Sequence, residues 1–225
     1  MQETDRSPWT VRSVVFDLDG LMIDSEPIFY EAACRLLAGR GCTPIPAVIR
    51  SMMGMPGRPA LALLREGHGL SATVEELATE TSQLFYEILG QKPMPLLPGV
   101  LDLLDRLEKR GVPKAIATSS RLRYVRRILE PHGLLKRFAF VLTADDVTNG
   151  KPAPEIYEKA AAQLGHAAAD MVVLEDSPNG LRAAKAAGAR CIVVPHALVA
   201  REDLAGADAV VPSLDAPLVH ELLGL

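Results

Sequence analysis

The chain of 225 residues is 48% hydrophobic, which is enough to bury one large domain or a core domain with a small partner. Its 24 basic residues almost balance its 28 acidic residues, and this excludes the strongly basic surface that nucleic acids and anionic membranes attract. Three cysteines without metal-ligand spacing, and no apolar run near the roughly 20 residues that span a bilayer, predict a cytoplasmic protein.

Short apolar runs recur along the chain, and each is followed by a helical pattern. The runs are apolar throughout rather than alternating, which is typical of strands buried on both faces. The six runs are Val14–Phe16, Ala115–Ala117, Phe140–Leu142, Val172–Leu174, Ile192–Val194 and Ala209–Val211. Apolar stripes over residues 100–107 and 156–164, and a helix start at Ser177, lie between them. This alternation predicts an α/β fold with a doubly wound parallel sheet.

One interval breaks this rhythm, because it holds four helical patterns and no convincing strand. The helical patterns cover Pro27–Leu37, Ala47–Met53, Arg58–Glu66 and Val74–Leu89. An all-helical stretch placed after the first strand predicts an inserted helical cap domain at residues 26–95. Residues 1–25 and 96–225 would then form a Rossmann-like core domain.

Polar side chains follow the strands of the predicted sheet. In open parallel sheets, ligands bind just beyond the carboxyl ends of the strands, so these side chains are candidates for a site. They are Asp17 and Asp19 after the first strand, Thr118, Ser119 and Ser120 after the second, Lys151 after the third, and Glu175 and Asp176 after the fourth. We expect them to gather at one edge of the sheet.

These residue types suit phosphoryl transfer. Carboxylates from separate loops can hold Mg²⁺, which would relieve the repulsion among them and the repulsion of a phosphate dianion. The Thr118 hydroxyl and the Lys151 ammonium can hold the phosphate oxygens. One aspartate can form an acyl phosphate, while an acid two residues away protonates the leaving oxygen and then deprotonates the attacking water.

The chain resembles the haloacid dehalogenase superfamily, and the resemblance covers nearly its whole length. The four motifs of that family match, in chain order, Asp17-x-Asp19-Gly20, Thr118, Lys151 and Glu175-Asp176. The helical insertion looks like the helical cap of that family. The resemblance implies a Mg²⁺-dependent phosphatase. Phosphatases of this family with similar motifs act on small phosphorylated metabolites such as sugar phosphates and nucleoside monophosphates.

The resemblance also implies a role for each motif residue. Asp17 would be the nucleophile and a Mg²⁺ ligand. Asp19 would be the general acid and base, and would bind the metal through its backbone carbonyl. Thr118 and Lys151 would hold the phosphate. Asp176, with Glu175 as a further candidate, would complete the metal site.

Substrate choice is expected from the cap. The segment from Gly54 to Arg58 resembles a cap loop that reaches over the active site, so both residues are candidate substrate contacts. The alternative for Arg58 is a solvent-facing arginine at the start of a helix. Ser119 and Ser120 likewise either bind phosphate or cap the helix that follows them.

Three functions compete for this chain. A phosphatase transfers the phosphoryl group to water, whereas a mutase that resembles β-phosphoglucomutase returns it to the sugar. Phe29 stands where those mutases carry a histidine, which favours hydrolysis. A catalytically silent interaction protein is disfavoured because every motif residue is intact, and a dehalogenase because Asp19 is present. We therefore expect a monomeric phosphoric monoester hydrolase with no nucleic-acid or membrane partner.

Overall fold

The structure is a computed structural model that describes residues 9–52, 57–91, 94–195 and 201–225. It divides into two compact units, one formed by Met1–Ile23 with Pro95–Leu225 and the other by Asp24–Met94. The first unit contains the sheet, and the second is helical in its described residues. None of the described helices is both long and apolar enough to cross a membrane.

The first unit is built on a parallel sheet, whose described strands follow the order β3-β2-β1-β4-β5-β6. The strands are β1 (Ser13–Phe16), β2 (Lys114–Ala117), β3 (Val141–Leu142), β4 (Met171–Glu175), β5 (Arg190–Val193) and β6 (Ala209–Val210). Each predicted apolar run overlaps one of them, so the doubly wound sheet is confirmed. The strand order reverses its direction between β1 and β4, which makes this the topological switch point where ligands bind in such sheets.

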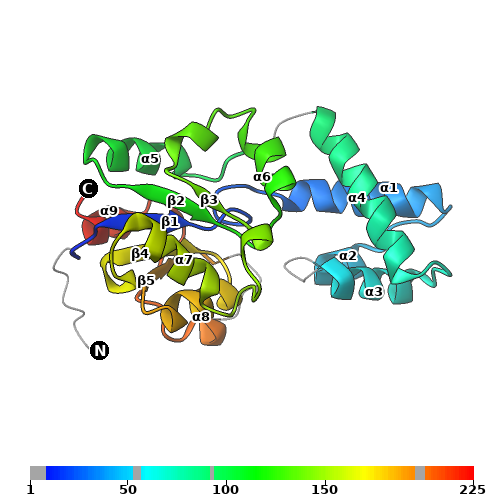
Figure 1. Ribbon diagram of the computed structural model, residues 1–225. Coiled ribbons are helices and arrows are strands. Elements are labelled where there is room, and N and C mark those ends of the chain that lie inside the picture. The colour runs from blue at the N-terminus through cyan, green and yellow to red at the C-terminus, as the bar shows by residue number, and fades with distance from the viewer. Residues whose placement is uncertain (1–8, 53–56, 92–93, 196–200) are drawn as a thin grey trace. The chain divides into compact units, whose positions relative to one another are not determined.

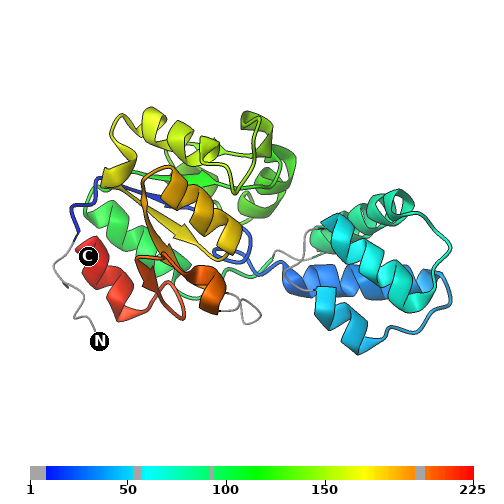
Figure 2. The same ribbon diagram turned by 90° about the horizontal axis from the view of Figure 1, so that it is seen from below.

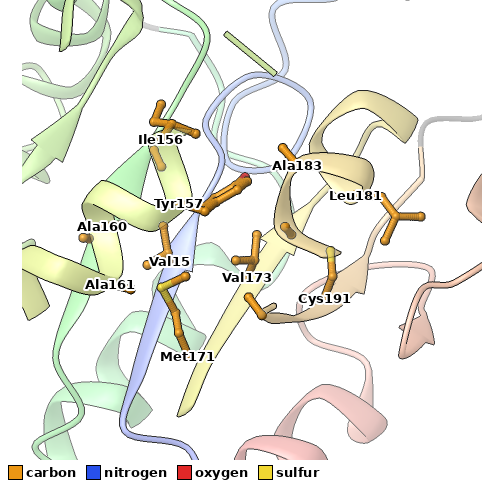
Figure 3. Close-up of a cluster of buried hydrophobic side chains, with 14 of the residues drawn as sticks. Val15, Ile156, Tyr157, Ala160, Ala161, Met171, Val173, Leu181, Ala183 and Cys191 are labelled. Carbon is orange, nitrogen blue, oxygen red and sulfur yellow. The ribbon is translucent and has the colours of Figure 1, made fainter. Parts of the chain in front are cut away.

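Helices cover both faces of this sheet (Figure 1). They are α5 (Val100–Lys109), α6 (Leu122–Leu129), α7 (Glu155–Leu164), α8 (Pro178–Ala186) and α9 (Pro217–Leu223). Val15, Val173 and Cys191 point from the strands toward α7 and α8 in one buried cluster (Figure 3). The alternate strand residues, such as Phe16, are also buried, which explains why the runs are apolar throughout. The predicted helix start at Ser177 is confirmed, because its hydroxyl accepts from the backbone N–H of Gly180.

The second unit has four helices among its described residues (Figure 2). They are α1 (Glu26–Gly39), α2 (Pro46–Met52), α3 (Gly57–His68) and α4 (Val74–Gln91). Each of the four predicted helical patterns overlaps one of them, although Met53, the expected end of the second, lies outside the described residues. Leu36, Leu64 and Leu77 are fully buried in the centre of this unit, so it has a hydrophobic core of its own.

Candidate active site

Lys151 joins three loops at the carboxyl edge of the sheet. Its ammonium donates to Asp17 Oδ1 at 2.5 Å, to Glu175 Oε1 at 2.6 Å and to the backbone carbonyl of Ala117 at 2.9 Å. These bonds occupy all three ammonium protons and connect the ends of β1, β2 and β4. Burial opposes the charge of Lys151, but the carboxylates of Asp17 and Glu175 outweigh that effect and raise its pKa. The predicted meeting of these three residues is therefore seen in the structure.

Glu175 is fully buried and has its carboxylate surrounded by donors. Oε1 accepts from the Lys151 ammonium and, at 2.6 Å, from the Tyr157 hydroxyl. Oε2 accepts from the backbone N–H groups of Asp176 and Ser177 and from the Ser177 hydroxyl, at 3.1 to 3.3 Å. A carboxylate has roughly four lone-pair positions, and five donors surround this one, so no acceptor position is left open. Glu175 is therefore held firmly in one orientation. In that orientation it fixes the position of the Lys151 ammonium.

Two further residues build the surroundings of Glu175. Tyr157 comes from α7 and lies inside the buried cluster (Figure 3), with the centre of its ring 5.0 Å from the Lys151 ammonium nitrogen. Gly180 in α8 has no room for a side chain, because a Cβ there would lie 1.8 Å from the Glu175 carboxylate. The absence of a Cβ at Gly180 therefore lets the first turn of α8 approach the end of β4 closely.

Three acidic side chains crowd together at the switch point. One carboxylate oxygen from each of Asp17, Glu175 and Asp176 lies within 4.8 Å of the other two. Burial raises the pKa of Asp17 from 3.8 to about 7, although Lys151 opposes the rise. Burial, and next the charge of Asp17, raise the pKa of Asp176 from 3.8 to about 9. Crowded carboxylate oxygens that resist ionisation in this way suit a divalent cation such as Mg²⁺, whose charge would favour their ionised forms.

Gly20 allows the first and fourth motifs to meet. Its backbone adopts a φ of 79°, and a Cβ there would lie 2.1 Å from Asp176 Oδ2. A side chain at this position would therefore be strained and would also displace the Asp176 carboxylate. The glycine of the first motif is thus explained by the close approach of its backbone to Asp176.

Asp19 lies beside the loop that follows β2. Its Oδ2 accepts from the Ser120 hydroxyl at 2.7 Å, and its Oδ1 accepts from the Tyr124 hydroxyl at 2.5 Å. Burial raises the pKa of Asp19, while the bonds from Tyr124 and then Ser120 oppose the rise. Thr118 is buried, and its Oγ1 accepts from the backbone N–H of Ser120 at 3.0 Å, whereas Ser119 is exposed. The structure therefore brings Ser120, but not Ser119, into contact with another predicted site residue.

The candidate residues of the second unit have different surroundings. Gly54 lies outside the described residues. The Arg58 side chain is 75% exposed and forms an ion pair of 3.0 Å with Glu75, so its role as a substrate contact stays a prediction. Phe29 is half exposed, packs against Phe85 with ring centres 4.6 Å apart, and lines a cavity of about 200 Å³ together with Tyr30.

Sequence patterns did not single out two tyrosines that contact the site. Tyr157 forms part of an apolar helical stripe, so its pattern indicates a core residue and says nothing of its hydroxyl. Tyr124 belongs to a short helix rich in arginine, and such a pattern is typical of a helix face exposed to solvent. A buried tyrosine usually finds a partner for its hydroxyl, and this general preference was the one available signal.

Comparison with known proteins identifies the family. A family model described as haloacid dehalogenase-like hydrolase matches residues 14–194. The chain belongs to this family. Among the haloacid dehalogenase-like hydrolases it is 33% identical to the phosphorylated carbohydrates phosphatase of Thermotoga maritima, over 84% of this chain and 87% of that protein. It is 36% identical to the validoxylamine A 7′-phosphate phosphatase of Streptomyces hygroscopicus subsp. limoneus, over 79% of this chain and 83% of that protein.

A solved structure with 28% sequence identity has the same fold. The structure of CbbY from Rhodobacter sphaeroides in complex with phosphate is 28% identical in sequence, with a TM-score of 0.73. The match covers 91% of this chain and 95% of that chain. The predicted superfamily, fold class and enzyme class, a phosphoric monoester hydrolase, are therefore confirmed.

Proposed function

We propose that this haloacid dehalogenase-like hydrolase is a Mg²⁺-dependent phosphatase in which Asp17 takes up the phosphoryl group. One observation carries the proposal: the Asp17 carboxylate is bonded to the buried ammonium of Lys151 and lies within 4.8 Å of Asp176. A nucleophilic oxygen, the firmly held ammonium of Lys151 and an acidic cluster therefore lie together at the switch point of the sheet. Phosphoryl transfer requires mainly such positioning and charge stabilisation.

The acidic cluster suits the metal that the family uses. Asp17 and Asp176 have raised pKa values because burial, and next the charges of neighbouring carboxylates, oppose their ionisation, and a bound cation would relieve both effects. These two carboxylates, with the backbone carbonyl of Asp19, would hold Mg²⁺. When bound, the metal neutralises charge on the phosphate and on the carboxylates. Glu175 is bonded by five donors of the chain itself, which supports a role in orienting Lys151 rather than a place next to the metal.

The first chemical step uses Asp17 and Asp19. An Asp17 oxygen bonds to phosphorus as the ester P–O bond breaks, and the Asp19 proton passes to the leaving oxygen. Lys151 and the Thr118 hydroxyl bind the remaining phosphate oxygens, where negative charge is spread. The burial that raises the pKa of Asp19 favours its protonated form, which is the form that this step needs. The products are an alcohol and an acyl phosphate on Asp17.

The second step reverses the role of Asp19. Ionised after the first step, Asp19 takes a proton from a water molecule as the water oxygen bonds to phosphorus. The bond between Asp17 and phosphorus breaks, inorganic phosphate leaves, and Asp19 is protonated again. Atoms and charge balance over the cycle, so the enzyme returns to its starting state without another reactant.

A phosphorylated sugar or a similar cyclic alcohol is the substrate class that we propose. The named relatives support it, since one acts on phosphorylated carbohydrates and another on validoxylamine A 7′-phosphate. Arg58 remains a candidate contact for a second polar group of the substrate.

The experiment is a screen of phosphorylated metabolites by phosphate release, with 4-nitrophenyl phosphate as the generic substrate. We expect turnover that disappears on chelation and returns with Mg²⁺. Asp17→Asn should reduce kcat by a factor on the order of a thousand or more, because the nucleophile is lost. The matched control is Asp203→Asn, an exposed aspartate whose replacement should leave the rate unchanged. Turnover that resists chelation, or that survives in Asp17→Asn, would contradict the proposal.

A further inference from the structure

Both oxygens of the Asp19 carboxylate are held by hydroxyl groups from outside the first motif. Ser120 donates to Oδ2 at 2.7 Å, and Tyr124 donates to Oδ1 at 2.5 Å. These two residues lie more than a hundred positions along the chain from Asp19, with separations of 101 and 105 residues. The orientation of the proposed acid is therefore set by the segment that follows β2, not by its own loop alone.

The two hydroxyls have different supports. Ser120 sits in the loop with Thr118, since its backbone N–H donates to Thr118 Oγ1 at 3.0 Å. Tyr124 lies in the first turn of α6, which is anchored to the core by the buried side chains of Val125 and Ile128. A serine hydroxyl rotates freely to a new partner, whereas a tyrosine hydroxyl is placed by its helix and its rigid ring.

We infer that Tyr124 is a positioning residue that aims Asp19 at the leaving oxygen, while Ser120 is its exchangeable partner. The inference rests on the proposed function, in which Asp19 is the acid. Protonation turns one Asp19 oxygen into a donor that must point at the leaving oxygen and weakens that oxygen as an acceptor, so the hydroxyl bonded to it is the one released most easily. The Ser120 hydroxyl can turn to a phosphate oxygen and free Oδ2, while Tyr124 continues to hold Oδ1.

This arrangement also accounts for the proton transfer. As the ester P–O bond breaks and the Asp17 oxygen bonds to phosphorus, the proton moves from Asp19 Oδ2 to the leaving oxygen. The Asp19 carboxylate that results is ionised, and Tyr124 stabilises it by donating to Oδ1. Without the Tyr124 hydroxyl the side chain of Asp19 can rotate about its χ angles, and fewer molecules hold the acid in the reactive direction.

The test uses the dependence of the rate on the leaving group. A sugar alcohol is a poor leaving group and needs the acid, whereas 4-nitrophenolate leaves with little help. We compare kcat/KM for glucose 6-phosphate and 4-nitrophenyl phosphate, because this constant reports the steps up to phosphoryl transfer to Asp17. Tyr124→Phe should lower kcat/KM for glucose 6-phosphate on the order of tenfold, and for 4-nitrophenyl phosphate by less than about threefold. Tyr86→Phe, a half-buried tyrosine on α4, is the matched control and should change neither.

A double-mutant cycle separates this inference from the proposed function. Asp19→Asn removes the acid, so Tyr124→Phe should have no further effect on glucose 6-phosphate in that background. Three results would overturn the role of Tyr124. In Tyr124→Phe, kcat/KM could fall equally for both substrates or for neither, or its loss could persist in the Asp19→Asn background. Asp19→Asn that slows both substrates equally would instead refute the acid role of Asp19. Thermal unfolding midpoints of each variant show whether a loss reflects folding, and Ser120→Ala should alter the substrate ratio less than Tyr124→Phe.

Discussion

Removing the charge of Asp17 should destroy activity and, without metal, stabilise the fold. Burial raises the pKa of Asp17 from 3.8 to about 7 in the folded protein. Between these values the folded protein holds a proton that the unfolded chain has already released, so stability falls as pH rises through that window. Each pKa unit corresponds to about 1.36 kcal/mol, so the complete ionisation of Asp17 costs on the order of 4 kcal/mol. Asparagine has nearly the same shape and cannot ionise.

The assay is urea unfolding of parent and Asp17→Asn proteins in a chelator, at about pH 5 and about pH 8. The advantage of Asp17→Asn should grow by roughly 3 kcal/mol between these two values, because at the lower pH the folded parent still has Asp17 mostly protonated. Asp203→Asn, at an exposed position, should change the free energy of unfolding by less than about 0.5 kcal/mol at either pH.

Added Mg²⁺ should make the parent protein more stable than Asp17→Asn. In the parent protein the cation would compensate the charge of Asp17, so the parent should gain more stability from Mg²⁺ than Asp17→Asn gains. An Asp17→Asn advantage that is equal at the two pH values would refute the reasoning. So would a variant that becomes less stable than the parent as pH rises in chelator, because that result would mean that the Lys151 bond outweighs burial and repulsion.

Two further results are expected. With β-glucose 1-phosphate the protein should release inorganic phosphate without forming glucose 6-phosphate, because Phe29 offers no titratable group; enzyme-coupled detection of accumulating glucose 6-phosphate would instead establish a mutase. Gly180→Ala should destabilise the protein by about 1–3 kcal/mol in urea unfolding, since its Cβ would lie 1.8 Å from the firmly held Glu175 carboxylate. Gly39→Ala, at a helical glycine with open space around it, should be neutral or stabilising, and equal effects at the two glycines would contradict the packing argument.

The sheet could be predicted from the sequence because its central strands β1, β2 and β4 are buried on both faces. Runs such as 172–174 are apolar at every position, and each ends at a glycine or at the polar residues of a loop. The strand ends then placed Asp17, Lys151 and Glu175 at one edge by topology alone, without any information about side chains. The structure has the three in direct contact.

The partners of the acidic groups could not be predicted in the same way. Tyr157 reaches Glu175 and Tyr124 reaches Asp19 only because α7 and α6 pack at particular angles against the sheet. A helical pattern identifies which face of a helix is buried, but it does not identify which buried atom meets a hydroxyl at the end of a ring. The number of donors to Glu175 was likewise invisible, since two of them are backbone N–H groups.

These contacts together suggest how Lys151 can bind both the empty site and a phosphate. Two of its three protons are engaged by groups that do not react, the Glu175 carboxylate and the backbone carbonyl of Ala117. Those two bonds fix the ammonium nitrogen. The third N–H of Lys151, which now donates to Asp17, can therefore donate to a phosphate oxygen instead without movement of the side chain. The buried Glu175 is therefore what lets a single lysine stabilise the nucleophile before substrate binds and the phosphate afterwards.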